Sequence, residues 1–179
     1  MVCEACTFET DRLSVDEWHS STLDDEELAR VVANLLTGPV TRSLPVSWRG
    51  RYTEDRARTW IEERDNEGTT LLVVERSTDR AIGLIILFET DPGSAPDGIE
   101  VRIGYLLSET VWGRGYATEL VRGFVGWCRG QPSIHSLAGG VERGNAASAR
   151  VLEKNGFHAV PGDEEVGSDE QVFRLILRP

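Results

Sequence analysis

A glycine-rich turn at residues 112–119, Trp-Gly-Arg-Gly-Tyr-Ala-Thr-Glu, has the residue types best suited to chemistry in this chain. An apolar run over residues 101–107 precedes it, and apolar residues at helical spacing follow it over residues 117–128. A glycine turn between a strand and a helix directs unpaired backbone N–H groups, with the positive end of the helix dipole, towards one point. Phosphate oxygens bind well at such a point, so the segment predicts a phosphate site.

The surrounding sequence separates this turn from two better known phosphate loops. A dinucleotide-binding fingerprint needs a third glycine where Thr118 stands, and an acidic residue about twenty positions later, near Ser136. A Walker loop needs Gly-Lys followed by Ser or Thr, which the sequence lacks. A tight turn whose glycines only permit close strand–helix packing is the alternative that spacing leaves open.

The composition is that of an acidic globular protein, with 179 residues and a net charge of −11. We expect one domain over residues 1–179, because a chain of this length buries roughly 70% of its surface without disulfides or metals. The charge argues against a nucleic-acid partner and favours a cationic one. No apolar run approaches the roughly 18 residues of a membrane span, and no secretory leader is evident, so we expect a cytoplasmic protein without membrane contact.

The three cysteines predict neither a metal site nor a redox site. Cys3 and Cys6 have half the spacing of a zinc site, but no second Cys or His pair matches them. They also lack the preceding strand and following helix of a redox motif. Cys128 falls on the apolar stripe after the glycine turn, where a core position is expected.

Apolar patterns also predict the elements that must position the turn. The expected helices begin at caps formed by Thr22 or Asp24, by Thr53 and by Asn145, with one more after the glycine turn. Gly83 marks an expected bulge. This order predicts an α/β (α+β) fold in which helices flank a mixed, mostly antiparallel central sheet. The expected strands cover residues 8–15, 70–75, 81–88, 99–107, 134–141, 157–160 and 171–177; residues 89–98 and 163–170 form loops, and residues 40–52 form a surface loop or a substrate-facing lid.

A second segment, residues 145–157, completes a recognisable pair of motifs. Together with the glycine turn it resembles the acetyl-CoA-binding motifs of the GNAT superfamily of N-acetyltransferases. Ile103-Gly104-Tyr105 followed by residues 112–119 is most similar to the RimJ/RimL-like branch, which acetylates the N-termini of ribosomal proteins. Residues 10–13, Thr-Asp-Arg-Leu, also resemble the opening strand of that branch. The resemblance implies a GNAT-like sheet whose fourth and fifth strands splay apart to hold the cofactor.

The resemblance implies acetyl-CoA as the co-substrate, with no metal, and direct attack of an amine in a ternary complex. The pantetheine arm is expected to take main-chain hydrogen bonds at Leu106 and Leu107, and to meet Asn145 at the start of the last helix. The pyrophosphate is expected on the backbone N–H groups of Gly113, Arg114, Gly115, Tyr116, Ala117 and Thr118.

Catalysis of this transfer requires deprotonation of the amine and stabilisation of the leaving thiolate. The tyrosine that many superfamily members use as general acid would fall at Leu152, so Ser148, one turn earlier, is the candidate thiolate stabiliser or proton donor. Glu100 is the candidate base and Tyr105 the second candidate. Strict alternation places these two on opposite faces of their strand, and a bulge would exchange the faces.

The function implied by the resemblance is N-acetylation of a primary amine, with a protein or peptide N-terminal α-amine as the first choice of acceptor. A small-molecule amine of the aminoglycoside or polyamine type is the alternative acceptor, and the acidic charge suits either. A non-catalytic acyl-CoA-binding module is the third hypothesis, because the tyrosine acid is missing. A homodimer is compatible with each of them.

Overall fold

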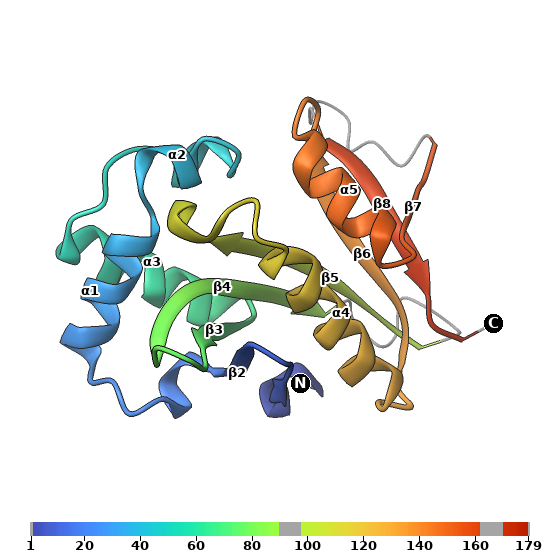
Figure 1. The fold of residues 1–179 in the computed structure, drawn as a ribbon, viewed down its shortest axis with the longest axis horizontal. Coiled ribbons are helices and arrows are strands. Elements are labelled where there is room, and N and C mark those ends of the chain that lie inside the picture. Colours follow the sequence, from blue (N-terminus) through green and yellow to red (C-terminus); the bar gives the residue numbers. More distant parts are fainter. Residues whose placement is uncertain (1, 90–97, 162–169, 179) are drawn as a thin grey trace.

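The computed structural model describes residues 2–89, 98–161 and 170–178. Within these ranges the strands form one eight-stranded sheet in the order β1-β2-β3-β4-β5-β6-β8-β7 (Figure 1). Adjacent strands are antiparallel except β5 and β6, which are parallel, so the predicted mixed α/β fold is confirmed. The strands are β1 (Phe8–Glu9), β2 (Leu13–Glu17), β3 (Thr69–Glu75), β4 (Arg80–Glu89), β5 (Ile99–Leu107), β6 (Ile134–Glu142), β7 (His158–Ala159) and β8 (Glu170–Ile176). The α-helices are α1 (Asp25–Leu35), α2 (Gly38–Thr41), α3 (Glu54–Glu67), α4 (Tyr116–Arg129) and α5 (Ala146–Lys154).

The predicted single strand over residues 8–15 is wrong. The segment folds as two short antiparallel strands, β1 and β2, with Phe8 opposite Val15. The hydroxyl of Thr10 accepts a hydrogen bond from the Leu13 N–H at 3.0 Å, and the Thr10 N–H donates to the Leu13 carbonyl at 2.9 Å. The polar residues between them therefore form a turn, and Arg12 lies near the tip of a hairpin.

Helices α1 and α3 cover one face of the sheet. Asp24, not Thr22, caps α1 through a capping box with Glu27, and Thr53 caps α3 as predicted. Local sequence therefore sets both helix starts, and burial of their apolar sides holds them to the strands. The shared core includes Leu28, Val32, Leu35, Trp60, Ile61, Leu72, Leu84 and Leu106.

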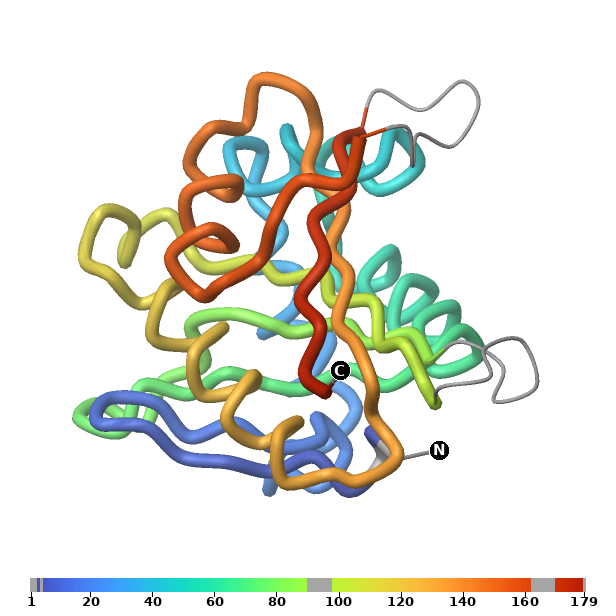
Figure 2. The backbone as a smooth tube through the Cα atoms, turned by 90° about the vertical axis from the view of Figure 1, so that its right-hand side faces the viewer, coloured from blue at the N-terminus to red at the C-terminus, as the bar shows by residue number. Residues whose placement is uncertain are grey.

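Helices α4 and α5 cover the opposite face, and Figure 2 shows α4 and α3 on opposite sides of the strands. Cys128 is fully buried in this second core, as predicted. Cys3 and Cys6 are buried there too, and burial raises the pKa of the Cys6 thiol to about 12, so it stays protonated at neutral pH. Among the described residues, no group of three or more His, Cys, Asp or Glu side chains is arranged to hold a metal ion.

The sheet opens between β5 and β6. The two strands pair only from Ile99 with Ile134 to Arg102 with Ala138, although β5 continues to Leu107 and β6 to Glu142. In Figure 1 β6 and β8 rise together away from β5. This opening, here called the split, is the splay predicted for the fourth and fifth strands.

The remaining elements agree with the sequence patterns where they can be compared. Val73 pairs with Gly83 and Val74 with Ala81, which leaves Ile82 as the extra residue of a bulge beside the predicted position. β7 and β8 form the predicted closing hairpin. Most of the two loops predicted at residues 89–98 and 163–170 lies outside the described residues. No helix in the described part of the chain is long and apolar enough to span a membrane.

Candidate active site

The glycine turn lies between the end of β5 and the start of α4, beside the split. Gly113 and Gly115 have φ angles of 72° and 81°, the left-handed region that glycine adopts without a steric penalty. The Glu119 N–H donates to the Gly115 carbonyl, so the N–H groups of the first three α4 residues have no acceptor within the helix. With the helix dipole, these groups have the geometry of an anion cradle, the arrangement that the sequence pattern indicated. They belong to Tyr116, Ala117 and Thr118.

The side chains next to the cradle point away from it and hold the turn in place. The buried Tyr116 hydroxyl donates to the carboxylate of Glu75 on β3, so Tyr116 offers the cradle only its backbone. The Trp112 indole N–H donates to the Leu107 carbonyl at 2.8 Å, which ties the start of the turn to the end of β5. Both contacts come from side chains inside the predicted motif.

Arg12 supports the turn from the β1–β2 hairpin. Its Nε donates to Glu119 Oε2 at 2.6 Å and its Nη1 donates to the Arg114 carbonyl at 3.1 Å. The guanidinium also stacks on the Tyr116 ring, 4.0 Å from the ring centre. Sequence reasoning did not assign Arg12 to the site, although residues 10–13 were part of the family resemblance and contained the signal.

The backbone of β5 is divided between its two neighbours. The Leu106 carbonyl faces β4, since a Cβ placed on Gly83 would lie 2.4 Å from that oxygen, and the Ser108 N–H donates to the Ile82 carbonyl. Backbone direction alternates along a strand, so Leu107 and Tyr105 direct their N–H and C=O groups towards the split. The Leu107 N–H therefore fits the expected pantetheine contact, while its carbonyl accepts the Trp112 indole N–H. The residue that shares the direction of Leu107 is Tyr105, not Leu106.

Tyr105, Ser148 and Asn145 lie together at the split. The Asn145 side-chain oxygen accepts the Ser148 N–H at 3.2 Å, which confirms the predicted cap of α5. The Tyr105 hydroxyl donates to the Ser148 carbonyl at 3.4 Å. Burial raises the pKa of Tyr105, and the Ser148 contact offsets this only partly, so the hydroxyl keeps its proton at neutral pH. A neutral tyrosine at this position can donate a proton.

Glu100 lies apart from this group. Its carboxylate accepts hydrogen bonds from Arg174 Nε at 2.7 Å and from the Ser136 hydroxyl at 3.0 Å. The continuous pairing of β5 with β4 preserves strict alternation, so Glu100 and Tyr105 are on opposite faces. Glu100 shares the face of β5 that packs against α1 and α3 further along the strand, and Tyr105 shares the face that packs against α4 and α5.

Leu152 occupies the position where the family's tyrosine acid would fall. It is 1% exposed and belongs to the core between α4, α5 and the sheet. A Cβ placed on Gly139 would lie 3.2 Å from Leu152 Cδ1, so strand β6 closes over this side chain. Leu152 therefore packs in the core and has no room for a ring that reaches the split.

The sheet is mixed, and it opens between two parallel strands beside a glycine turn and a helix N-terminus. This arrangement defines an acetyltransferase class of fold. The sequence model of the family described as Acetyltransferase (GNAT) domain matches residues 19–158. The chain belongs to this family, whose fold uses acetyl-CoA.

A known protein is similar to this chain in sequence over part of its length. The "Probable N-acetyltransferase YjcK" of Bacillus subtilis (strain 168) is 36% identical over 110 residues, which are 62% of this chain and 57% of that protein. The chain thus spans little more than half the length of this relative.

Two solved structures with coenzyme A share the fold. AAC(6')-Ib in complex with ribostamycin and coenzyme A has a TM-score of 0.74 at 16% identity, covering 93% of this chain and 94% of that one. RimL, the ribosomal L7/L12 alpha-N-protein acetyltransferase, in complex with coenzyme A, has a TM-score of 0.70 at 14% identity, covering 93% and 95%. At these identities the likeness is one of fold.

Proposed function

We propose that this protein is an acetyl-CoA-dependent N-acetyltransferase that acetylates a primary amine by direct attack in a ternary complex. The observation that carries the proposal is the split between β5 and β6 directly beside the anion cradle of α4. The cradle suits a pyrophosphate, and a split lined by strand backbone suits an extended amide arm. Membership of the family supports the same activity.

The residues around the cradle fit coenzyme A. Gly115 faces open space, because a Cβ there would meet only Arg12 Nη2, at 3.7 Å. We assign pyrophosphate binding to the backbone of Gly113, Arg114 and Gly115 and to the first turn of α4. Leu107 and the amide of Asn145 bind the pantetheine arm. Bound acetyl-CoA supplies the activated thioester.

For the leaving thiolate we assign the proton donor to Tyr105, with Ser148 beside it as the stabilising hydroxyl. The raised pKa of Tyr105 suits the role of proton donor better than the role of base that the sequence suggested for it. The Tyr105 hydroxyl donates to the backbone carbonyl of Ser148, between β5 and α5, where we expect the arm to end. This pair replaces the tyrosine that Leu152 excludes.

For the amine we keep Glu100 as the candidate base. It lies on the face of β5 opposite Tyr105, so acid and base would act from the two sides of the sheet. Arg174 and Ser136 hold its carboxylate in a defined position. Glu100→Gln distinguishes the roles: loss of kcat with unchanged folding supports a base, whereas loss of stability alone supports an anchor.

The first choice of acceptor is a protein or peptide N-terminal α-amine, by similarity to the fold of RimL. A small-molecule amine is the second candidate, favoured by the comparable likeness to AAC(6')-Ib and by the net charge of −11. A non-catalytic acyl-CoA-binding module is the third. The test measures free-thiol release from acetyl-CoA with a panel of N-terminal peptides and a panel of small amines. Turnover with small amines alone would refute the first choice, and CoA binding without any turnover would support the third.

A further inference from the structure

The face of the split opposite α4 has space on the β5 side, where β5 and β6 diverge. Beyond the last paired residues, the first positions on this face are Gly104 of β5 and Gly140 of β6, neither of which has a side chain. A Cβ placed on Gly104 would meet nothing closer than 3.8 Å, whereas one placed on Gly140 would lie 2.5 Å from Glu170 Oε2, so the Glu170 carboxylate covers the Gly140 position. Because the anion cradle begins α4 on the other face, an acceptor amine can approach on this face beside Gly104.

Residues 40–52, between α1 and α3, form a fixed wall on the side of α1 and α3. The Tyr52 hydroxyl donates to the Trp48 carbonyl at 3.0 Å, and the guanidinium of Arg64 stacks 4.2 Å above the Trp48 ring. Arg64 is only 2% exposed, so this stacking is part of the core. The Arg56 guanidinium donates to the backbone carbonyls of Ser47, Arg49 and Arg51. These contacts make the segment a pre-organised wall.

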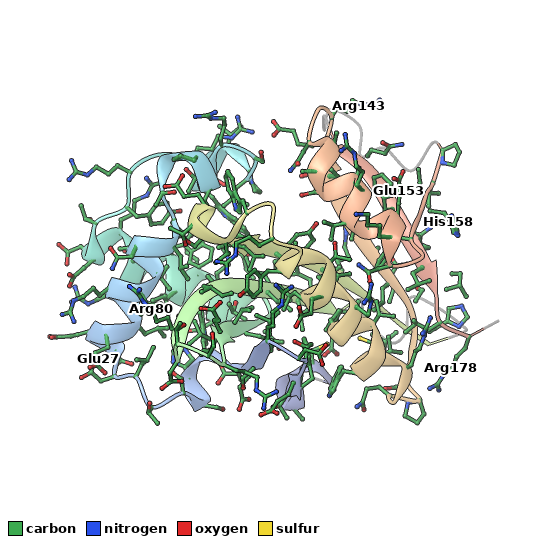
Figure 3. All side chains as sticks on the ribbon, in the orientation of Figure 1. Glu27, Arg80, Arg143, Glu153, His158 and Arg178 are labelled. Atoms are coloured by element: carbon green, nitrogen blue, oxygen red, sulfur yellow. The ribbon has the colours of Figure 1, made fainter. Side chains whose placement is uncertain are left out.

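One ion pair joins this wall to the far side of the split. Arg49 Nη2 donates to Glu142 Oε1 at 2.8 Å, and Arg49 Nε donates to the Leu44 carbonyl at 2.8 Å. Glu142 is the last residue of β6, and in Figure 3 its neighbour Arg143 marks this end of the strand. The Arg49–Glu142 pair therefore closes the open end of the split.

A second carboxylate residue, Glu170, stands beside Glu142 on the neighbouring strand. In the pairing of β6 with β8, Glu142 is directly opposite Glu170. Like charges at opposite strand positions repel, and a cation between them relieves the repulsion. The side chains of Arg49 and Glu142 are 39% and 33% exposed, and ion pairs this exposed contribute little to stability. A substrate cation can thus replace the guanidinium at little cost.

We propose that Glu142 selects acceptors that carry a second positive charge, and that Arg49 occupies its carboxylate until such an acceptor arrives. The inference rests on the proposed acetyl transfer to an amine. The reacting amine lies at the split near Gly104, and the second cation binds Glu142 at the end of β6. The acceptor class is an amine with a second cationic group, supplied by a diamine or by a peptide with a basic residue next to its N-terminus.

The test compares matched acceptors that differ in one charge. 1,4-Diaminobutane is compared with n-butylamine, and a Ser-Arg N-terminal peptide with a Ser-Gln peptide, which separates the two sources of the cation. The measured quantity is the preference, defined as the ratio of kcat/KM for the dicationic acceptor to kcat/KM for the matched acceptor with one positive charge fewer. We expect Glu142→Gln to lower the preference about tenfold and Arg49→Gln to raise it about threefold, the scale of one charged contact.

The decisive result is a preference that falls in Glu142→Gln and rises in Arg49→Gln. If the ion pair only held the wall in place, both variants would change the preference in the same direction, and that result would overturn the proposal. The exchange Arg49→Glu with Glu142→Arg restores an ion pair and is expected to lose the preference. Arg58→Gln is the control: it removes an arginine of similar exposure, whose ion-pair partner Asp55 on α3 is more exposed than Glu142, and it should leave the preference unchanged.

Equilibrium binding separates this inference from the proposed function. Calorimetric titration of 1,4-diaminobutane into the protein with CoA present should show binding that Glu142→Gln weakens. Such binding without turnover of any amine would sustain a cation site at Glu142 but refute the proposed acetyl transfer. Turnover of both amines without any dependence on the second charge would support the proposed acetyl transfer and refute the inference about Glu142.

Discussion

Arg12 and Glu119 are 107 positions apart in the chain and are joined by two kinds of contact at once. The Arg12 backbone N–H donates to Glu119 Oε1 at 2.9 Å while its guanidinium contacts Oε2 at 2.6 Å. The same guanidinium donates to the Arg114 carbonyl. The β1–β2 hairpin is thus bonded to the glycine turn at Arg114 and at Glu119, and the orientation of the cradle depends on these contacts.

We therefore expect Arg12→Lys to weaken CoA binding about tenfold, because lysine keeps the charge but cannot contact Glu119 and the Arg114 carbonyl together. Calorimetry with CoA gives the affinity. Arg76→Lys is the matched control, since Arg76 binds the Thr10 carbonyl of the same hairpin without touching the turn. Equal losses in both variants would show that the hairpin acts only through general stability.

The Arg12–Glu119 pair also predicts an acid-dependent stability. Burial raises the pKa of Glu119, but hydrogen bonds from Thr10 and Arg12 outweigh it and hold the pKa below its usual value. Its stabilisation is thus present above the unfolded pKa of about 4.3 and is lost as the pH falls through the lower folded value. We expect Glu119→Gln to cost about 1–3 kcal/mol of unfolding free energy at pH 7. This difference should shrink below about pH 4 in denaturant titrations, and a constant difference would contradict the assignment.

Gly115→Glu should abolish CoA binding while the fold remains. The left-handed φ of 81° strains any side chain by roughly 1–2 kcal/mol, and the carboxylate would occupy the anion cradle. Gly126→Glu adds the same charge to an exposed position of α4, where a Cβ meets nothing within 4 Å. The control should bind CoA normally. Unchanged affinity in Gly115→Glu would place the pyrophosphate elsewhere.

Tyr105→Phe should lower kcat by about 10²-fold, the range of a lost general acid, and leave CoA affinity unchanged. Because burial raises the pKa of Tyr105, wild-type kcat should fall only at strongly alkaline pH, as the hydroxyl ionises. That alkaline decline should be absent from the variant. Ser148→Ala is expected to lower kcat less, since the tyrosine proton would remain. A wild-type activity in Tyr105→Phe would exclude it as the donor.

Leu152→Tyr tests whether the acid position of other family members can be restored. The buried site beneath Gly139 has no space for a ring, so overpacking should cost about 1–3 kcal/mol in denaturant unfolding. No gain in kcat is expected. A stable variant with a higher kcat would show that Leu152 does face the reaction.

The sequence by itself determined the features that depend on local spacing. Caps and apolar periods predicted α1, α3 and α5, and α5 runs from Ala146 to Lys154 as the Asn145 cap indicated. The glycine turn was predicted because left-handed φ angles and free helix N–H groups arise within a few residues. The hairpin at residues 8–15 was mistaken for one strand because a two-residue strand has too few positions to show a period.

Only the tertiary structure decided which side chains meet at the site. Arg12 reaches Glu119, Glu100 binds Arg174, and Arg49 binds Glu142 across 107, 74 and 93 positions of the chain. Such contacts depend on how the strands are ordered and where the sheet splits, and no local pattern encodes that arrangement. The alternation of side chains along a strand predicted that Glu100 and Tyr105 lie on opposite faces of β5. Which of the two shares its face with the anion cradle became clear only from the packing of α4 and α5 against the face that carries Tyr105.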